Sequence, residues 1–276
     1  SHKDYDLIKN EDVQKMYSTQ KPDIVFHLAA AVGGIEINQK NPGKFFYENA
    51  IMNLQMIHEG LNKKIEKIIS AGTVSCYPSN SPLPFTEENI WNGFPEEANA
   101  PYGIAKRIMH VQSDSYKKQY NFNSIVLLLT NLYGPNDNYS LKTSHFFPAL
   151  ISKIYFAKKN KRKFITIWGN GSPKRELMYV DDLADACEFF LKRKTNHSLI
   201  NIGNGQEKTI LDYCKFILRK IDANLKVKFD KKKPNGTPRK KLNSNLAIKY
   251  GWKSKFDLNT GFNFTYKDFL KKTGLN

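Results

Sequence analysis

Short apolar runs alternate along this chain with longer amphipathic segments. The runs Asp23–Leu28, Ile65–Ser70 and Ser124–Leu129 are rich in Ile, Val and Leu and are typical of β-strands. Two further strands are predicted at 164–168 and 199–202. From Ile125 the third run is continuously apolar, which indicates a strand buried on both faces of a parallel sheet.

The segments between these runs favour helices. Pro101 suits the first turn of one helix, and Asp181 suits the N-cap of another. Strands separated by helices predict βαβ units, so the expected fold class is α/β with a doubly wound, Rossmann-like parallel sheet. The predicted helices cover residues 42–61, 101–120, 143–158, 181–192 and 209–221.

Four segments follow predicted strands and are rich in small or polar residues. They are Ala29–Gly34, Gly72–Pro78, Thr130–Asn138 and Gly203–Gly205. The carboxyl ends of parallel strands meet at one edge of a sheet, where ligands bind in open α/β folds. We therefore expect a ligand crevice at that edge. The segment Ser79–Asn99, rich in Pro, Asn and Glu, is interpreted as an ordered functional loop.

Length and composition narrow the class of protein. The chain has 276 residues, 40% of them hydrophobic, which is enough for a sizeable core and excludes wholesale disorder. No apolar run approaches the roughly 20 residues of a membrane-spanning helix, and the first residues do not resemble a signal peptide. Cys76, Cys187 and Cys214 are too few and too scattered for a disulfide framework or a zinc site. We expect a cytoplasmic protein without a metal.

The charge is strongly positive, with 43 Lys and Arg against 26 Asp and Glu and a net charge of +17. Such a balance suits nucleic acid, an anionic membrane or an anionic small substrate. The lysines are spread over the whole chain, and the denser clusters at 158–163 and 231–241 have no interleaved aromatic residues for stacking on bases. We expect no nucleic-acid or membrane partner.

Tyr102 and Lys106 are four residues apart and therefore share one face of their predicted helix. A nearby cation stabilises a phenolate, so we expect Lys106 to lower the pKa of Tyr102 and make it a usable acid or base near neutral pH. The bare motif is weak, since most chance occurrences are surface pairs. Here it follows a strand that ends in Gly72-Thr73, whose hydroxyl is a natural partner, and we predict a catalytic role.

Longer motifs reinforce this interpretation. General ones are His27–Ala30 and Asn99–Lys106, and far more specific ones are Thr130–Asn138, Ser144-His145 and Lys233–Lys240. Further matching runs are Val32–Ile35, Trp168–Glu176, Val180–Asp182 and Asn201–Gly205. Through them almost the whole chain resembles the extended short-chain dehydrogenase/reductases that act on nucleotide sugars. Within that family it is most similar to the GDP-L-fucose synthases.

The resemblance implies an activity. It implies NADPH-dependent epimerisation and reduction of GDP-4-keto-6-deoxymannose to GDP-L-fucose, with NADP as cofactor, a GDP-sugar as substrate and a homodimer as assembly. It also implies an NADP-binding domain over residues 1–135 and 164–203 and a smaller substrate domain over 136–163 and 204–276. One alternative is another NAD(P)-dependent nucleotide-sugar epimerase, dehydratase or reductase. The other is a non-catalytic nucleotide-binding or nucleic-acid-binding protein.

The resemblance also implies roles for single residues. Tyr102 would protonate the sugar oxygen at C4, and Lys106 would hold the nicotinamide ribose. Thr73 stands where the family has the Ser or Thr of its catalytic Ser/Tyr/Lys triad. His145 matches the acid of the epimerisation step. Cofactor contacts are implied for Ala29, Ala30, Gly72, Tyr102, Lys106, Asn131, Leu132 and His145. Substrate contacts are implied for Lys153, Trp168, Arg175, Arg239 and Lys240, whose cations suit a diphosphate.

The sequence departs from the family in two places. The family opens with a strand, a G-x-x-G-x-x-G loop and a helix that hold the cofactor pyrophosphate, and nothing before Asp4 matches them. We therefore expect the printed chain to bind NADPH weakly or not at all. The second departure concerns the family's epimerisation base, a Cys. Ser75 occupies that position and Cys76 follows it, so either Cys76 is the base or the chain reduces without epimerising.

Overall fold

The computed structural model describes residues 3–33, 35–141, 143–233 and 235–274. These residues form two compact units that are distinguished by their internal contacts. Unit 1 comprises Ser1–Leu129, Ala184–Ile202 and Asn243–Lys253, and unit 2 comprises Thr130–Leu183, Gly203–Leu242 and Ser254–Asn276.

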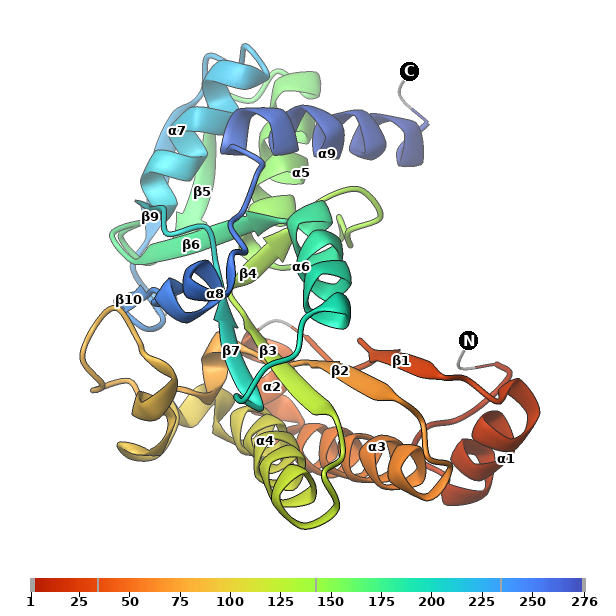
Figure 1. The fold of residues 1–276 in the computed structure, drawn as a ribbon. Coiled ribbons are helices and arrows are strands. Elements are labelled where there is room, and N and C mark those ends of the chain that lie inside the picture. Colours follow the sequence, from red (N-terminus) through yellow and green to blue (C-terminus); the bar gives the residue numbers. More distant parts are fainter. Residues whose placement is uncertain (1–2, 34, 142, 234, 275–276) are drawn as a thin grey trace. The chain divides into compact units, whose positions relative to one another are not determined.

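Unit 1 combines helices with a parallel sheet (Figure 1). The helix α6 (Val180–Lys192) begins in unit 2, and its residues from Ala184 onward belong to unit 1. Its strands are β1 (Ile24–His27), β2 (Lys67–Ala71), β3 (Ser124–Leu129) and β7 (Leu199–Ile202), and its α-helices are α1 (Asn10–Gln20), α2 (Ile35–Lys40), α3 (Pro42–Asn62), α4 (Ala100–Tyr120) and α8 (Asn245–Tyr250), with short 3-10 helices η1 (Val74–Cys76), η2 (Glu87–Trp91) and η3 (Glu97–Asn99).

The four strands of unit 1 lie in the order β1-β2-β3-β7 and all pair in parallel. Phe26 is opposite Ile69, and Leu127 is opposite Ile200. Every residue of β3 and β7 is buried, as the continuous apolar run predicts for a strand covered on both faces. The predicted α/β, Rossmann-like parallel sheet is confirmed.

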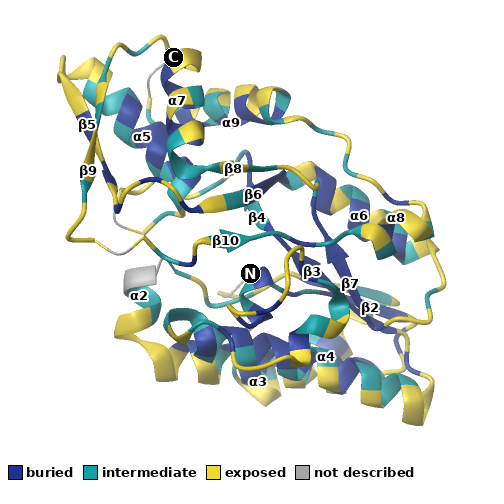
Figure 2. Cartoon of the chain, turned by 90° about the vertical axis from the view of Figure 1, so that its left-hand side faces the viewer, coloured by how far each residue is buried: buried dark blue, intermediate teal, exposed yellow. Residues whose placement is uncertain are grey.

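The long helices α3 and α4 lie side by side along one face of this sheet (Figures 1 and 2). Their outward faces are exposed, whereas the residues toward the strands are buried (Figure 2). In the same sheet, the side chain of Lys67 in β2 donates hydrogen bonds to three carbonyls at the end of α6, those of Phe190, Leu191 and Arg193. Three carbonyls that the helix leaves unpaired are thereby satisfied.

The segment from Ser79 to Asn99 is ordered, as predicted, because one buried amide holds it against β7. The side chain of Asn201 donates to the carbonyls of Phe85 and Asn243 at 2.9 and 3.2 Å and accepts from the Tyr77 hydroxyl at 2.7 Å. The Asn201 backbone N–H donates to the Glu87 carboxylate at 2.8 Å. The segment is therefore anchored to unit 1 through Phe85 and Glu87 and is not a hinge.

Unit 2 contains smaller sheets and the helices that pack on them. The order β10-β6-β4 is parallel, β8 joins β6 in the antiparallel sense, and β5 pairs in parallel with β9. Its strands are β4 (Asn131–Tyr133), β5 (Phe164–Trp168), β6 (Lys174–Tyr179), β8 (Glu207–Thr209), β9 (Lys226–Asp230) and β10 (Arg239–Lys240), and its helices are the start of α6, α5 (Phe146–Lys159), α7 (Ile210–Lys220) and α9 (Leu258–Lys272).

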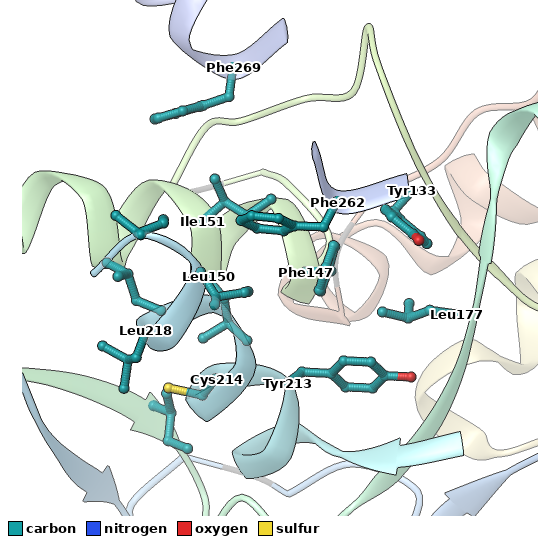
Figure 3. Packing of buried hydrophobic residues seen from close by; sticks show 14 of the residues in the cluster. Tyr133, Phe147, Leu150, Ile151, Leu177, Tyr213, Cys214, Leu218, Phe262 and Phe269 are labelled. Carbon is teal, nitrogen blue, oxygen red and sulfur yellow. The ribbon is translucent and has the colours of Figure 1, made fainter. Parts of the chain in front are cut away.

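The core of unit 2 is rich in aromatic side chains that meet edge to face (Figure 3). Phe147 of α5 lies 4.8 Å from the ring of Tyr133 and 5.7 Å from that of Tyr213, at steep interplanar angles. Ile165 and Ile167 of β5 and Phe269 of α9 belong to the same buried cluster. This packing ties α5, α7 and α9 to the strands that carry the basic residues of unit 2.

All the predicted strands and helices are present, with ends that differ by a few residues. The main difference concerns Phe164–Trp168, which the prediction assigns to the cofactor domain. In the structure this strand pairs with β9, a five-residue segment of alternating charged and apolar residues that was not predicted as a strand. The division into units accordingly differs from the predicted domains, since residues 164–183 belong to unit 2 and 243–253 to unit 1.

Within the described part of the chain, no helix is long and apolar enough to cross a membrane.

Candidate active site

The predicted common edge is present in unit 1. The four parallel strands end at His27, Ala71, Leu129 and Ile202, so the chain leaves the sheet on the same side after each of them. Gly72 is required at one of these points, because a Cβ there would come within 2.8 Å of Leu128. The residues that follow β2 are thus held tightly against β3.

The start of α4 lies against the turn that follows β2. A Cβ on Gly103 would come within 2.5 Å of the Ser75 carbonyl oxygen, so only glycine permits this approach. The Cys76 thiol donates to the Gly103 carbonyl at 3.3 Å. Arg107 donates from Nε to the Cys76 carbonyl at 2.7 Å and from its NH1 group to the Gly93 carbonyl at 2.9 Å. Tyr102 is therefore held beside the turn that contains Thr73.

We expect Gly103→Ala to destabilise the protein, since the clash is with the Ser75 backbone and cannot be relieved by movement of a side chain. Displacement of the start of α4 from the turn after β2 should lower the free energy of unfolding by about 1–3 kcal/mol and lower any turnover that depends on Tyr102. Gly43→Ala in α3 is the matched control, because a Cβ there meets no atom within 4 Å and should stabilise its helix slightly. Denaturant unfolding and turnover of both variants check this. Equal stability of the two would contradict the close approach.

The predicted lowering of the Tyr102 pKa is wrong. Burial raises the pKa of the Tyr102 phenol, and the neighbouring Cys76 thiol raises it further. The desolvation of the phenolate outweighs any attraction to the ammonium. Tyr102 therefore keeps its proton at neutral pH, which suits a proton donor rather than a base.

Lys106 is the most unusual group of unit 1. It is 2% exposed, and no described residue accepts a hydrogen bond from its Nζ atom. Burial lowers its pKa from 10.5 to about 8, partly opposed by Cys76. An unpaired buried ammonium is costly in a folded protein, and such groups concentrate at functional sites. The hydroxyls of a nicotinamide ribose are acceptors that would satisfy it, so this residue fits the dinucleotide that the sequence implies.

Sequence reasoning missed a buried pair next to Lys106. His27 Nε2 lies 2.9 Å from the Asn53 side-chain oxygen, and the Asn53 amide donates to the Ala105 carbonyl at 3.1 Å. Burial, together with the Lys106 charge, lowers the pKa of His27 to about 4, so the imidazole is neutral near pH 7. The pair joins β1, α3 and α4. The only sequence signal was a polar residue at the end of an apolar strand.

Thr73, Ser75 and Cys76 differ in their exposure. Thr73 and Ser75 are partly exposed, and the Thr73 hydroxyl accepts a hydrogen bond from the Ser75 backbone N–H at 3.2 Å. Cys76 is fully buried, with its thiol directed to α4. The single-residue shift of the cysteine thus moves the thiol from the open side of the turn to its packed side.

The predicted cofactor contacts of unit 1 lie at strand ends. Ala29 and Ala30 follow β1 and line a cavity of about 430 Å³, together with Tyr5, Met16 and Met52. Their small side chains leave the backbone accessible. Gly34, in the same predicted segment, lies outside the described residues.

The remaining predicted cofactor contacts belong to unit 2. Asn131 and Leu132 are in β4, where the Asn131 amide donates to the Glu176 carbonyl at 3.3 Å. His145 is exposed and is the N-cap residue of α5. Burial raises the pKa of Asp137, partly opposed by a hydrogen bond from the Asn138 N–H and by His145.

Lys153 and Trp168 meet at a cavity of about 350 Å³ in unit 2. The Lys153 Nζ atom lies 6.0 Å from the centre of the Trp168 ring, and burial lowers the pKa of this lysine. The Nζ atom of Lys233, to which the sequence assigned no role, lies 5.0 Å from the same ring. An aromatic surface flanked by two cations suits a planar anionic ligand.

Arg175, Arg239 and Lys240 belong to neighbouring strands. Lys240 of β10 is in register with Arg175 of β6. Arg175 donates to the Thr237 carbonyl at 2.7 Å, and Arg239 donates from Nε to both carboxylate oxygens of Glu207 at 2.8 and 2.9 Å. These bonds fix the two strands, and the Arg239 guanidinium is committed to Glu207.

A buried carboxylate supports these strands. Glu176 accepts hydrogen bonds from the backbone N–H groups of Gly205 and Leu242 at 2.6 and 3.1 Å, and burial raises its pKa. Its next strand neighbour, Arg175, is thereby fixed beside β10. Among the described residues, no group of three or more His, Cys, Asp or Glu side chains is arranged to hold a metal ion.

Comparison with known proteins decides the family. The model of the NAD dependent epimerase/dehydratase family matches residues 2–203. The chain belongs to the NAD dependent epimerase/dehydratase family. It is 36% identical over 271 residues to GDP-L-fucose synthase 1 of Arabidopsis thaliana, covering 98% of this chain and 84% of the relative.

Solved structures agree with this assignment. A GDP-6-OMe-4-keto-L-xylo-heptose reductase from C. jejuni superposes with a TM-score of 0.92 at 26% identity, covering 99% of this chain and 89% of that one. An NADP-bound GDP-L-fucose synthetase from Naegleria fowleri gives 0.91 at 25% identity, covering 99% and 84%. The chain is therefore an enzyme of the NAD(P)-dependent, extended short-chain dehydrogenase/reductase type, as the motifs predicted.

Proposed function

We propose that this protein is a GDP-L-fucose synthase, which uses NADPH to convert GDP-4-keto-6-deoxymannose to GDP-L-fucose. One observation carries the proposal: the unpaired, buried Lys106 ammonium lies one helical turn after Tyr102, on a helix packed against the turn that contains Thr73. The name of the Arabidopsis thaliana relative supplies the substrate class.

The cofactor proposal is NADP. Lys106 would hold the ribose hydroxyls, with Ala29, Ala30 and Gly72 at the strand ends and Asn131, Leu132 and His145 in unit 2 as further contacts. The NADP-bound structure of the Naegleria fowleri relative favours NADP over NAD. When bound, the dinucleotide supplies the hydride that reduces C4.

The residues of this chain handle the proton. Tyr102, protonated at neutral pH, would give its proton to the C4 oxygen of the sugar. Thr73 would donate a hydrogen bond to the same oxygen. The Lys106 ammonium would stabilise the phenolate that remains, since both groups lie on one face of α4.

Unit 2 would recognise the nucleotide. We propose Lys153, Trp168, Arg175 and Lys240 as substrate contacts, with the lysines and Arg175 serving the diphosphate. Lysine at 153 binds as a point charge and offers no bidentate fork. Arg239 is engaged by Glu207, so its proposed contribution is to hold β10 in place.

Epimerisation at C3 and C5 requires a base that is anionic near pH 7. A thiolate meets this requirement, whereas a Ser hydroxyl needs its own activating base. We propose Cys76 as the base and His145 as the acid that returns the proton. A second candidate function, reduction at C4 without epimerisation, is favoured by the full burial of Cys76 and by Ser75 at the family's cysteine position.

Solvent deuterium distinguishes the two candidates. In the full-length protein we expect exchange at C3 and C5 in wild type and in Ser75→Ala, and loss of exchange in Cys76→Ser. Proton NMR of the sugar measures it. Exchange that persists in Cys76→Ser removes Cys76 as the base, and wild type without exchange supports the reductase.

We also propose an oligomeric state and a cellular compartment for this protein. We propose a homodimer formed through α3 and α4, where Tyr47, Leu54 and Val111 expose apolar surface of unit 1. The buried cysteines Cys76, Cys187 and Cys214, which form no disulfide with one another, suit a reducing compartment such as the cytoplasm. Sedimentation of the full-length protein tests the dimer.

A further inference from the structure

Within the described part of the chain, the cavity beside Trp168 is lined by one acidic side chain, Asp230, and one basic side chain, Lys153, among mostly apolar residues. Strand β5 alternates buried Ile165 and Ile167 with the more exposed Phe164, Thr166 and Trp168. Parallel pairing with β9 places Asp230 opposite Trp168. Register partners on neighbouring strands direct their side chains to the same face of the sheet. Both residues accordingly line the cavity of about 350 Å³.

The position of Asp230 is fixed by local hydrogen bonds. Its side-chain oxygen Oδ1 accepts from the Lys232 backbone N–H at 3.1 Å, and its carbonyl accepts from the Gly169 N–H at 2.9 Å. Asn235 accepts from the Asn170 N–H at 2.8 Å and so binds the following loop to the turn after Trp168. A carboxylate offers about four lone-pair positions, so most of its acceptor capacity remains.

The Asp230 carboxylate itself is unsuited to a diphosphate and suited to a nucleobase. A carboxylate repels phosphates, for which Lys153 and Lys233 near the Trp168 ring supply positive charge. The ring itself provides a stacking surface. A carboxylate in such a cavity can bind a ligand that presents two adjacent N–H donors.

Guanine is the nucleobase that presents such a pair. Its N1–H and its exocyclic amine lie side by side, and two carboxylate oxygens can accept both. Adenine presents a donor next to an acceptor at the same edge, and uracil has its N–H between two carbonyls. Hypoxanthine keeps N1–H but lacks the amine, so it isolates the contribution of that one group.

We infer that Asp230 is a specificity-determining residue that reads the Watson–Crick edge of guanine while the base lies against Trp168. The inference rests on the proposed function and adds to it the group that selects a guanine nucleotide. A site built to bind a donor discriminates strongly against an analogue that lacks it, because its own acceptor is then left unpaired.

The experiment compares GDP and IDP in calorimetric titrations of the full-length protein. Wild type should bind GDP at least about 10-fold more tightly than IDP. Asp230→Asn retains the acceptor for the Lys232 N–H but offers guanine one acceptor in place of two. Its preference for GDP should fall to about 2-fold or less. The matched control is Asp222→Asn, an exposed residue of the same unit that should keep the wild-type ratio.

The outcomes separate this inference from the proposed function. A wild-type GDP/IDP ratio retained in Asp230→Asn overturns the role of Asp230, while turnover of the keto sugar would leave the proposed function standing. Failure of wild type to bind GDP overturns both. If Asp230→Asn unfolds, Asp230→Glu supplies the test. A carboxylate on a side chain one methylene longer should weaken the binding of GDP more than the binding of IDP. Equal weakening of both nucleotides contradicts the inference.

Discussion

Replacement of Tyr102 by Phe should lower turnover of the keto sugar by about two to four orders of magnitude, the usual contribution of a general acid. The substitution removes one oxygen and keeps the aromatic ring. Because the pKa of the phenol is raised by burial, wild-type Tyr102 holds a transferable proton throughout the neutral range. Binding of the GDP-sugar should change little. Steady-state kinetics of NADPH consumption in the full-length protein, with a separate binding titration, measure both effects.

Tyr120→Phe is the matched control for this prediction. Tyr120 lies at the end of the same helix, is 50% exposed, and packs edge to face on Tyr116. Its loss of a hydroxyl should leave turnover unchanged. If Tyr102→Phe reduces the substrate at a near-normal rate, Tyr102 is not the proton donor.

Replacement of Lys106 by Met should stabilise the protein while nearly abolishing reduction. The folded protein holds this ammonium in a buried position, which lowers its pKa from 10.5 to about 8. Each unit of pKa corresponds to about 1.4 kcal/mol, so the buried charge costs about 3 kcal/mol at pH 7. Methionine has a similar length and no charge, and it removes that cost. Turnover should fall by at least about 100-fold because the phenolate loses its cation.

The stability gain should depend on pH in a defined direction. Below pH 8 both the folded and the unfolded chain bind the Lys106 proton, and the full cost of the buried charge is present. Between pH 8 and 10.5 the folded chain releases the proton while the unfolded chain keeps it, so wild-type stability from this group rises with pH. The advantage of Lys106→Met should therefore shrink across this window.

Denaturant unfolding at several pH values checks this expectation. Lys118→Met is the control, because Lys118 lies on the same helix, is exposed, and pairs with Asp114 at 2.6 Å on the surface. Exposed pairs contribute little, so this variant should match wild type within about 0.5 kcal/mol. A Lys106→Met variant that is less stable than wild type at pH 7 would show that the ammonium has an unrecognised partner.

The strands of unit 1 and its binding edge could be predicted from local sequence patterns. Continuous apolar runs predicted the buried parallel strands, and the four strand ends predicted the edge near which Thr73, Tyr102 and Lys106 lie. These features depend on local composition and on the geometry of parallel sheets. They are therefore predictable before any coordinate is known.

Other features depend on contacts between distant residues. The strand β9 is short and largely exposed and was not predicted, so its pairing with β5, and the place of Asp230 opposite Trp168, follow only from the fold. The sign of the Tyr102 pKa shift was also beyond reach. Proximity to Lys106 can be read from spacing, whereas the desolvation that outweighs it depends on how tightly α4 packs, which Gly103 permits.

The central claim is that this enzyme transfers hydride from NADPH to C4 of a GDP-4-keto-6-deoxyhexose. The most direct measurement uses full-length protein, NADPH that carries deuterium at the transferable position, and GDP-4-keto-6-deoxymannose. We expect a GDP-deoxyhexose product with one deuterium bound at C4, detected by NMR and mass spectrometry, and equimolar NADP. Recovery of the unreduced keto sugar with deuterated NADPH left intact would contradict it.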